Sequence, residues 1–148
     1  MDEAYIREAI ELARAAVSNG NTPFGSLLVV GGTVRRRSEN TTLTDDDVTA
    51  HPELKLARWA ARELDADELA DCTMYTSTEP CEMCATAVHY AGLDRVVYSV
   101  SGESLATLRG TAHSGVPCEE IIERNGGSTA VDGPVLEAEG LRVHEEYR

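Results

Sequence analysis

The 148-residue chain carries 26 acidic against 13 basic residues, which gives it a formal net charge of −13 at pH 7. Such a surface repels nucleic acid at long range, because binding to a polyanion depends on lysine and arginine side chains that neutralise phosphates. No apolar run approaches the roughly 20 residues that span a bilayer, and the acidic, amphipathic start of the chain is unlike a signal peptide. We therefore expect one soluble, cytoplasmic domain over residues 1–148, large enough to bury a core.

The acidic excess also favours a protein adapted to high salt, since screening by salt tolerates dense negative charge. The alternative is an ordinary acidic protein whose arginine content follows codon usage. Lys55 is the only lysine, and the one basic cluster, Arg35-Arg36-Arg37, is too short to reverse the charge argument.

Hydrophobic periodicity and turn residues predict alternating helices and strands. Apolar residues recur at helical spacing at the start of the chain, and Gly31-Gly32 then joins two strands in a tight turn. In chain order we expect a helix over 2–18, strands over 26–30 and 33–37, a polar loop over 36–50, a helix over 52–66, a strand over 72–78, a helix over 81–92, a strand over 95–100, a helix near 119–124, a strand over 128–131 and a helix over about 134–146.

This order places helices on both faces of a mixed sheet. One hairpin opens the sheet, and strands linked by helical crossovers follow it. The expected fold is an α/β protein, a three-layer α/β/α sandwich with a mixed five-stranded sheet.

Two short motifs contain the residues for a metal site. His51 and Glu53 lie in "TAHPE", where a loop enters a helix, and Cys81 and Cys84 lie in "TEPCEMC", at the start of the next long helix. A spacing of three puts both cysteines on one helical face, and the positive end of the helix dipole favours their thiolates. With His51 as third ligand, the fourth tetrahedral position stays open for water, as in catalytic zinc sites.

Glu53 lies two residues from the histidine, near the metal but not as a ligand. A carboxylate in that position can take a proton from the water and return it to a ring nitrogen and a leaving amine. Zinc lowers the pKa of its water toward neutrality, so the pair suits hydrolysis. The full His-x-Glu and Pro-Cys-x-x-Cys pattern is the signature of zinc deaminases of nucleobases.

From "NTPFGSLLVV" to "RVVYSV" the chain resembles the cytidine deaminase-like superfamily, in the branch of guanine, cytosine and tRNA adenosine deaminases. The resemblance implies one zinc ion per subunit, with Glu53 as proton shuttle. It also implies that Asn40 hydrogen-bonds the base, that Phe24 and Gly25 flank the pocket, and that the Cys81 amide helps to hold the hydroxide.

Three features depart from the usual family pattern or extend it. The usual His-Ala-Glu is His-Pro-Glu here, and Pro52 is expected to hold the helix start without touching the ligands. Tyr90 stands where guanine deaminases carry an aromatic residue. The acidic, aromatic end of the chain resembles segments that close over the base in free-base deaminases, which makes Glu146 a candidate substrate contact. The resemblance further implies a homodimer.

The reaction expected is hydrolytic release of ammonia from a free nucleobase or small nucleoside, with guanine and cytosine as leading candidates. A tRNA adenosine deaminase is the alternative, although the chain has few basic residues to hold RNA. A non-catalytic zinc scaffold would have no need of Glu53. The Cys-x-x-Cys could also be a redox pair, or a closed zinc site completed by Cys72, Cys118 or His113. Asn40 as a turn residue and Phe24 as core packing are the structural alternatives for the pocket residues.

Overall fold

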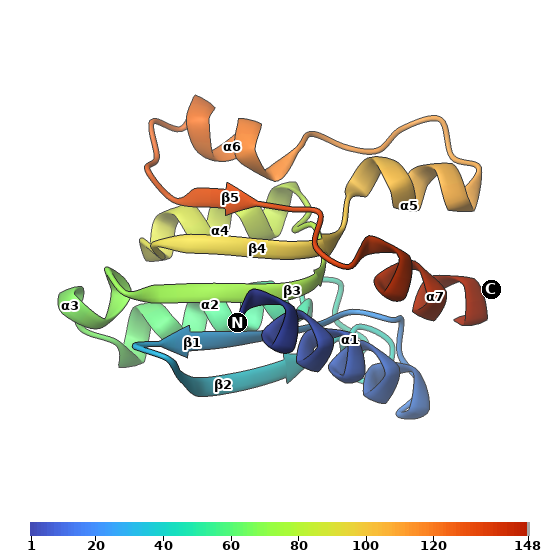
Figure 1. Cartoon of the computed structure of the whole chain (residues 1–148), viewed down its shortest axis with the longest axis horizontal. Helices are drawn as coiled ribbons and strands as arrows, with labels where there is room; N and C mark the ends of the chain where they lie inside the picture. The colour runs from blue at the N-terminus through green and yellow to red at the C-terminus, as the bar shows by residue number, and fades with distance from the viewer. Residues whose placement is uncertain (148) are drawn as a thin grey trace.

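The computed structural model of the chain describes residues 1–147 (Figure 1). Its elements, in chain order, are α1 (Asp2–Ser18), β1 (Gly25–Val30), β2 (Thr33–Glu39), α2 (Pro52–Glu63), α3 (Ala66–Leu69), β3 (Cys72–Thr78), α4 (Glu82–Ala91), β4 (Arg95–Val100), α5 (Gly102–Arg109), α6 (Cys118–Arg124), β5 (Ala130–Asp132) and α7 (Glu137–Tyr147).

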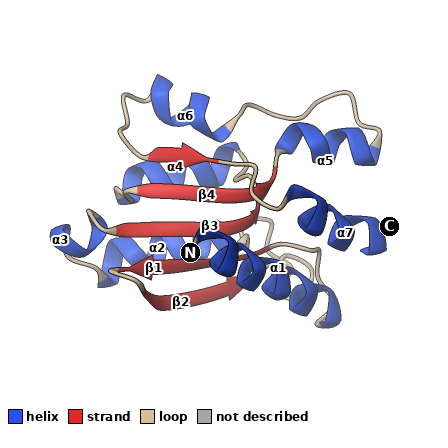
Figure 2. Ribbon diagram, viewed as in Figure 1, coloured by secondary structure: helices blue, strands red, loops and turns tan. Residues whose placement is uncertain are grey.

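The five strands form one mixed sheet in the order β2-β1-β3-β4-β5 (Figure 2). β1 runs antiparallel to both β2 and β3, whereas β3, β4 and β5 are parallel to one another. The hairpin at the start and the helical crossovers that follow confirm the expected mixed five-stranded sheet.

Helices cover both faces of the sheet, with α1 and α7 in front and α2 and α4 behind in the view of Figure 1. The alternation of side chains along each strand divides the core accordingly. Leu28 and Met74 pack with α2 and α4, whereas Leu27 and Tyr75, their neighbours in sequence, pack with α1 and α7. The three-layer α/β/α sandwich is therefore confirmed.

Two helices differ from the expected boundaries, and α3 and α5 were not expected. α2 ends at Glu63, because Asp65 starts a new helix with a capping box to Glu68. Ser101 caps α5 by accepting a hydrogen bond from the Ser104 amide, and Gly110 ends that helix. α7 begins at residue 137, three residues later than expected. Local capping residues thus decide boundaries that hydrophobic periodicity leaves open.

None of the helices in residues 1–147 is long and apolar enough to cross a membrane.

Gly25 lets α1 pack tightly against the start of β1. A Cβ at this position would lie 2.5 Å from the Ala13 nitrogen and from the Leu12 Cβ of that helix. We expect Gly25→Ala to destabilise the protein by about 2 kcal/mol, because overfilling a packed core costs roughly 1–3 kcal/mol. Urea unfolding followed by circular dichroism measures the change.

Gly32→Asn is the matched control, since a Cβ at Gly32 meets no atom within 4 Å and asparagine tolerates its positive φ of 79°. Equal stability losses in the two variants would contradict the packing role of Gly25.

Candidate metal centre and catalytic cavity

The starts of α2 and α4 supply the three candidate metal ligands. His51 is the residue that precedes α2, and Cys81 is the residue that precedes α4, with Cys84 inside its first turn. Pro52 occupies the first turn of α2, where a fixed φ suits the helix and a missing N–H costs nothing. The two helices lie side by side behind the sheet (Figure 1), so their first turns meet at one site.

The spacing of the three donor atoms fits a tetrahedral zinc ion. The Nδ1 atom of His51 lies 3.6 Å from the Cys81 sulfur and 3.5 Å from the Cys84 sulfur. Zinc bonds of about 2.0–2.1 Å to nitrogen and about 2.3 Å to sulfur, at a tetrahedral angle, give a separation of about 3.6 Å. Among residues 1–147 no other His, Cys, Asp or Glu joins this group. The geometry therefore fits an open three-ligand site and offers no fourth side chain to close it.

The electrostatics of the group favour the ligand form of Cys81. A hydrogen bond from the Cys84 thiol, and then one from His51, lower the pKa of Cys81 to about 4. The hydrogen bond to Cys81 in turn raises the pKa of His51. Cys81 is thus a thiolate at a helix start, the form that binds metals.

Glu53 is buried beside this group, with 4% of its surface exposed. Burial raises the pKa of its carboxyl to about 7. Its Oε1 atom has no hydrogen-bond partner among the described residues. A buried carboxylate oxygen without a partner is costly, and in native proteins such groups usually have a functional reason.

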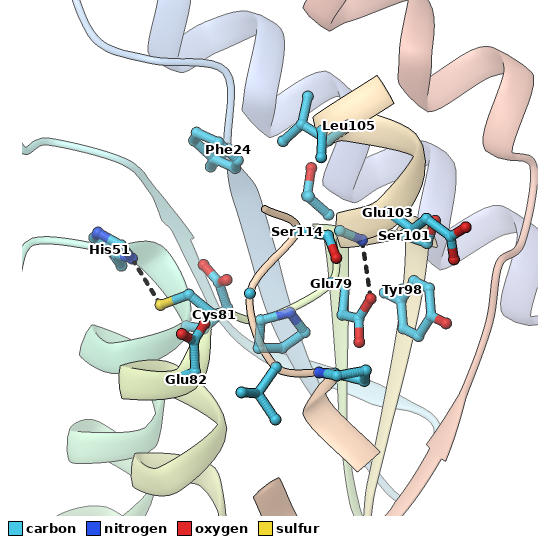
Figure 3. Close-up of a pocket in the computed structure, with 18 of the residues that line it drawn as sticks. Phe24, His51, Glu79, Cys81, Glu82, Tyr98, Ser101, Glu103, Leu105 and Ser114 are labelled. Atoms are coloured by element: carbon cyan, nitrogen blue, oxygen red, sulfur yellow. Dashed lines mark hydrogen bonds between the residues drawn. The ribbon is translucent and has the colours of Figure 1, made fainter. Parts of the chain in front are cut away.

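A cavity of about 580 Å³ is lined by Glu53 and by two of the three ligands, His51 and Cys81. Figure 3 shows its walls: Phe24 stands opposite the residues of α5, and Cys81 and His51 lie at one side. The cavity also takes in the segment 111–117, which joins α5 to α6. Its volume is in the range of small-molecule sites, roughly 300–1,000 Å³.

Asn40 and Phe24 both line the cavity, as expected. Asn40 is 3% exposed, and its Oδ1 accepts hydrogen bonds from the amide and hydroxyl of Thr42. These bonds fix the side chain and leave its Nδ2 as the donor for a bound molecule. Asn40 therefore shapes the loop as well as the cavity.

Three of the expected substrate contacts lie elsewhere. Gly25 is not among the cavity-lining residues, because its role is the close packing of α1. Tyr90 is 77% exposed, since it comes two residues after the buried Val88 and faces the opposite side of α4. Glu146 pairs with Arg14 of α1, 2.8 Å away, and its helix turns that side chain from the cavity.

The sequence interpretation missed the wall that α5 and the following segment provide. Glu103, Leu105 and Arg109 of α5 line the cavity, as does Glu79 just before Cys81. The two carboxylate oxygens of Glu79 accept hydrogen bonds from the Gly102 and Cys118 amides, at 2.9 and 2.8 Å. Glu79 thus ties α5 and α6 to the strand end beside the ligands (Figure 3). The Glu-Pro pair before Cys81 was the only local signal for it.

His144 is a buried residue of α7, 3% exposed, that the sequence analysis did not single out. Its Nε2 lies 2.9 Å from the hydroxyl of Thr78, and its ring meets the Phe24 ring at a centroid distance of 5.4 Å. Burial, and then the charge of Arg109, lower the pKa of His144 to about 4. The neutral side chain of His144 in α7 therefore contacts two residues that line the cavity, Thr78 and Phe24.

Known proteins are similar to this chain in sequence and in fold. Residues 1–100 match the family described as the cytidine and deoxycytidylate deaminase zinc-binding region. A probable cytosine deaminase of Schizosaccharomyces pombe is 32% identical over 99% of this chain and 91% of its own length. The chain belongs to the cytidine deaminase-like family of zinc-dependent deaminases.

Other relatives of this deaminase match a shorter stretch. The guanine deaminase of Bacillus subtilis is 38% identical over 66% of the chain and 63% of its own length. The tRNA-specific adenosine deaminase of the same organism is 36% identical over 66% of the chain and 60% of its own length. The solved structure of a guanine deaminase from Nitrosomonas europaea superposes with a TM-score of 0.82 over 98% of the chain and 83% of its own, at 23% identity, which shows a common fold.

Cys84→Ala should remove zinc from the deaminase. The loss of one of three ligands should weaken zinc binding well beyond the roughly 10–100-fold effect of an outer-shell substitution. Elemental analysis of the purified variant after dialysis measures the bound metal. Cys72→Ala is the matched control, because Cys72 is an equally buried free thiol in the core behind the sheet. Stoichiometric zinc in Cys84→Ala would place the metal elsewhere.

His144 should make the deaminase sensitive to mild acid. Its pKa is about 4 in the folded protein and about 6.5 when unfolded, so below about pH 6.5 the unfolded chain binds a proton that the folded chain excludes. Stability is therefore lost as the pH falls, by about 2 kcal/mol from this residue between pH 7 and pH 5.

The comparison with His144→Gln isolates this contribution, since all other groups titrate in both proteins. We expect the stability advantage of the wild type over His144→Gln to shrink by about 2 kcal/mol over that range. Urea unfolding at the two pH values measures it. An advantage that does not change with pH would show that His144 is protonated equally in both states.

Proposed function

We propose that the deaminase hydrolyses the exocyclic amine of a free nucleobase or small nucleoside, guanine or cytosine, and releases ammonia. The observation that carries this proposal is Glu53, a buried carboxylate that has an unpartnered oxygen, lies beside three zinc ligands and lines a cavity of small-molecule size. A structural zinc site has no use for such a carboxylate, which argues against the non-catalytic scaffold.

The net reaction exchanges an amine for an oxygen: water adds to the ring carbon, and the carbon–nitrogen bond to the amine breaks. When bound, zinc supplies a Lewis acid that activates water at His51, Cys81 and Cys84. Glu53 takes one proton from the water and delivers it to the ring nitrogen. It then takes the second proton of the water, from the hydroxyl group of the adduct, and delivers it to the departing amine, which leaves as ammonia. The cavity walls hold the ring in place for these transfers.

The size and lining of the cavity support a single base as substrate. Phe24 offers an aromatic surface, and the fixed Asn40 offers a donor for a ring oxygen or nitrogen. The probable cytosine deaminase of Schizosaccharomyces pombe matches nearly the whole chain, and a solved structure with the same fold contains 8-azaguanine. These observations support cytosine and guanine as the candidate substrates.

A tRNA adenosine deaminase is the second candidate, supported by the similarity to the Bacillus subtilis enzyme. The net charge of −13 opposes it, because RNA binding requires cations along the path of the backbone. We therefore place the small-molecule reaction first.

Further properties of the deaminase belong to the same proposal. We propose that residues 1–148 form a single domain, that the protein is a homodimer in the cytoplasm, and that its acidic surface is adapted to high salt. Sedimentation and unfolding at low and at molar KCl test the dimer and the salt adaptation.

Glu53→Gln should keep the zinc and the fold and lose turnover by about a thousandfold, since general acid–base groups contribute roughly 10²–10⁴-fold. Ammonia release at saturating substrate measures the change. Glu123→Gln, which removes the same charge from an exposed site on α6, is the control. Turnover of Glu53→Gln near the wild-type rate would refute the assigned proton transfer.

Ammonia release from guanine, cytosine, cytidine, guanosine, adenine and an anticodon stem-loop, each at low and at molar KCl, tests the substrate. Release from one base or nucleoside, abolished in Glu53→Gln, is the expected result. Release from the stem-loop alone would replace the proposal with the tRNA reaction.

A further inference from the structure

A second hollow, of about 340 Å³, lies between the edge strand β2 and the outer side of α2. Figure 1 shows this edge of the molecule, where β2 has no further strand beside it and α2 runs behind. We define the hollow as the arginine groove. It is lined by Arg36 and Arg37 of β2 and by Lys55, Arg58, Trp59 and Arg62 of α2.

The arginine groove concentrates positive charge in an otherwise acidic protein. It holds five of the 13 basic side chains of the chain, against a single lining carboxylate, Glu63. Lys55, Arg58 and Arg62 follow one another at spacings of three and four, so they share one helical face. Like charges at such spacing destabilise a helix, which means that α2 gains nothing from this arrangement by itself.

Three of the four arginines that line the groove have no carboxylate partner, whereas most arginines elsewhere in the described residues have one. Arg36, Arg58 and Arg62 form no ion pair within residues 1–147. Outside the groove, ion pairs with carboxylates are formed by Arg7, Arg14, Arg35, Arg95 and Arg124. Arg37, the fourth arginine of the groove, pairs with Glu8 of α1, which packs on the other face of the sheet.

Two further contacts hold cations of the groove in position. The guanidinium of Arg36 lies 5.4 Å from the centre of the Trp59 ring, a cation–π contact. The ammonium of Lys55 donates hydrogen bonds to the Glu39 carbonyl oxygen and the Thr41 hydroxyl, both neutral groups.

Asp47 is the carboxylate whose pKa is lowered first by its own hydrogen bonds to Thr49 and then by Arg58 and Lys55, but it forms no ion pair with either cation. Preorganised cations that form no ion pair are the arrangement expected of a phosphate-binding site.

We propose that the arginine groove binds a small ligand that carries a diphosphate group. Cations face the hollow from two elements, so they suit two linked phosphates better than one carboxylate. A long polyanion is disfavoured, since it would leave the groove and run along a surface of strong negative charge. The volume of the groove is at the lower end of small-molecule sites.

The single tryptophan of the chain makes the groove directly observable, because Trp59 lines it. The zinc-loaded protein is titrated with inorganic pyrophosphate at constant ionic strength, and Trp59 fluorescence and heat of binding are recorded. We expect a saturable signal that sulfate does not reproduce. We expect Arg58→Glu/Arg62→Glu to lower the affinity at least about tenfold, because two charge-assisted contacts are reversed.

Arg124→Glu/Arg142→Glu is the matched control, since it makes the same change in net charge at exposed positions on α6 and α7. The zinc centre is common to all three proteins, so chelation of zinc by pyrophosphate would alter their signals alike. Pyrophosphate binding that survives in the groove variant, or that falls equally in the control, would overturn the proposal.

Two other outcomes would replace the ligand. Binding of an RNA stem-loop more tightly than pyrophosphate, abolished by the groove variant, would make the groove an RNA surface. An absent pyrophosphate signal, with a dimer in the wild type and a monomer in the groove variant by sedimentation, would make it an interface between copies of the chain.

Discussion

The structure of this deaminase depends on the packing of two helix starts against each other. α2 and α4 lie side by side on one face of the sheet, and the residue before each helix is a metal ligand. The positive ends of both helix dipoles therefore point at one site, where they favour thiolate and carboxylate. Any change in how the two helices sit on the sheet would move His51 relative to Cys81 and Cys84.

The site is held at a cost to the fold. Glu53 is buried with an oxygen that no described residue satisfies, and it lines a cavity instead of packing against neighbours on every side. Proteins accept such violations of good packing mainly where function requires them. Glu79 offsets part of this cost. Its carboxylate accepts hydrogen bonds from backbone amides at the starts of α5 and α6, and so fixes the wall of the cavity beside the ligands.

Charge acts on two scales in this molecule. The overall negative charge sets which partners approach, and it disfavours extended polyanions. Locally, the arginines between β2 and α2 form a surface of the opposite sign, held by Trp59 and by hydrogen bonds of Lys55. The cavity at the start of α2 and the proposed anion site farther along the same helix can thus coexist, since each depends on short-range contacts.

The sheet, the layers and the candidate metal ligands could all be predicted from the sequence. These follow from periodicity and from motifs at helix starts, where the sequence position of a residue also fixes its place in space. Only the tertiary structure decided which side chains face the cavity. The helices that carry Tyr90 and Glu146 were predicted, but both side chains lie on the side of the helix that faces away from the cavity. His144 is buried because α7 packs against the end of β3 and against Phe24. Which face of a helix points into the cavity depends on contacts between residues far apart in the chain, and a local sequence pattern does not reveal those contacts.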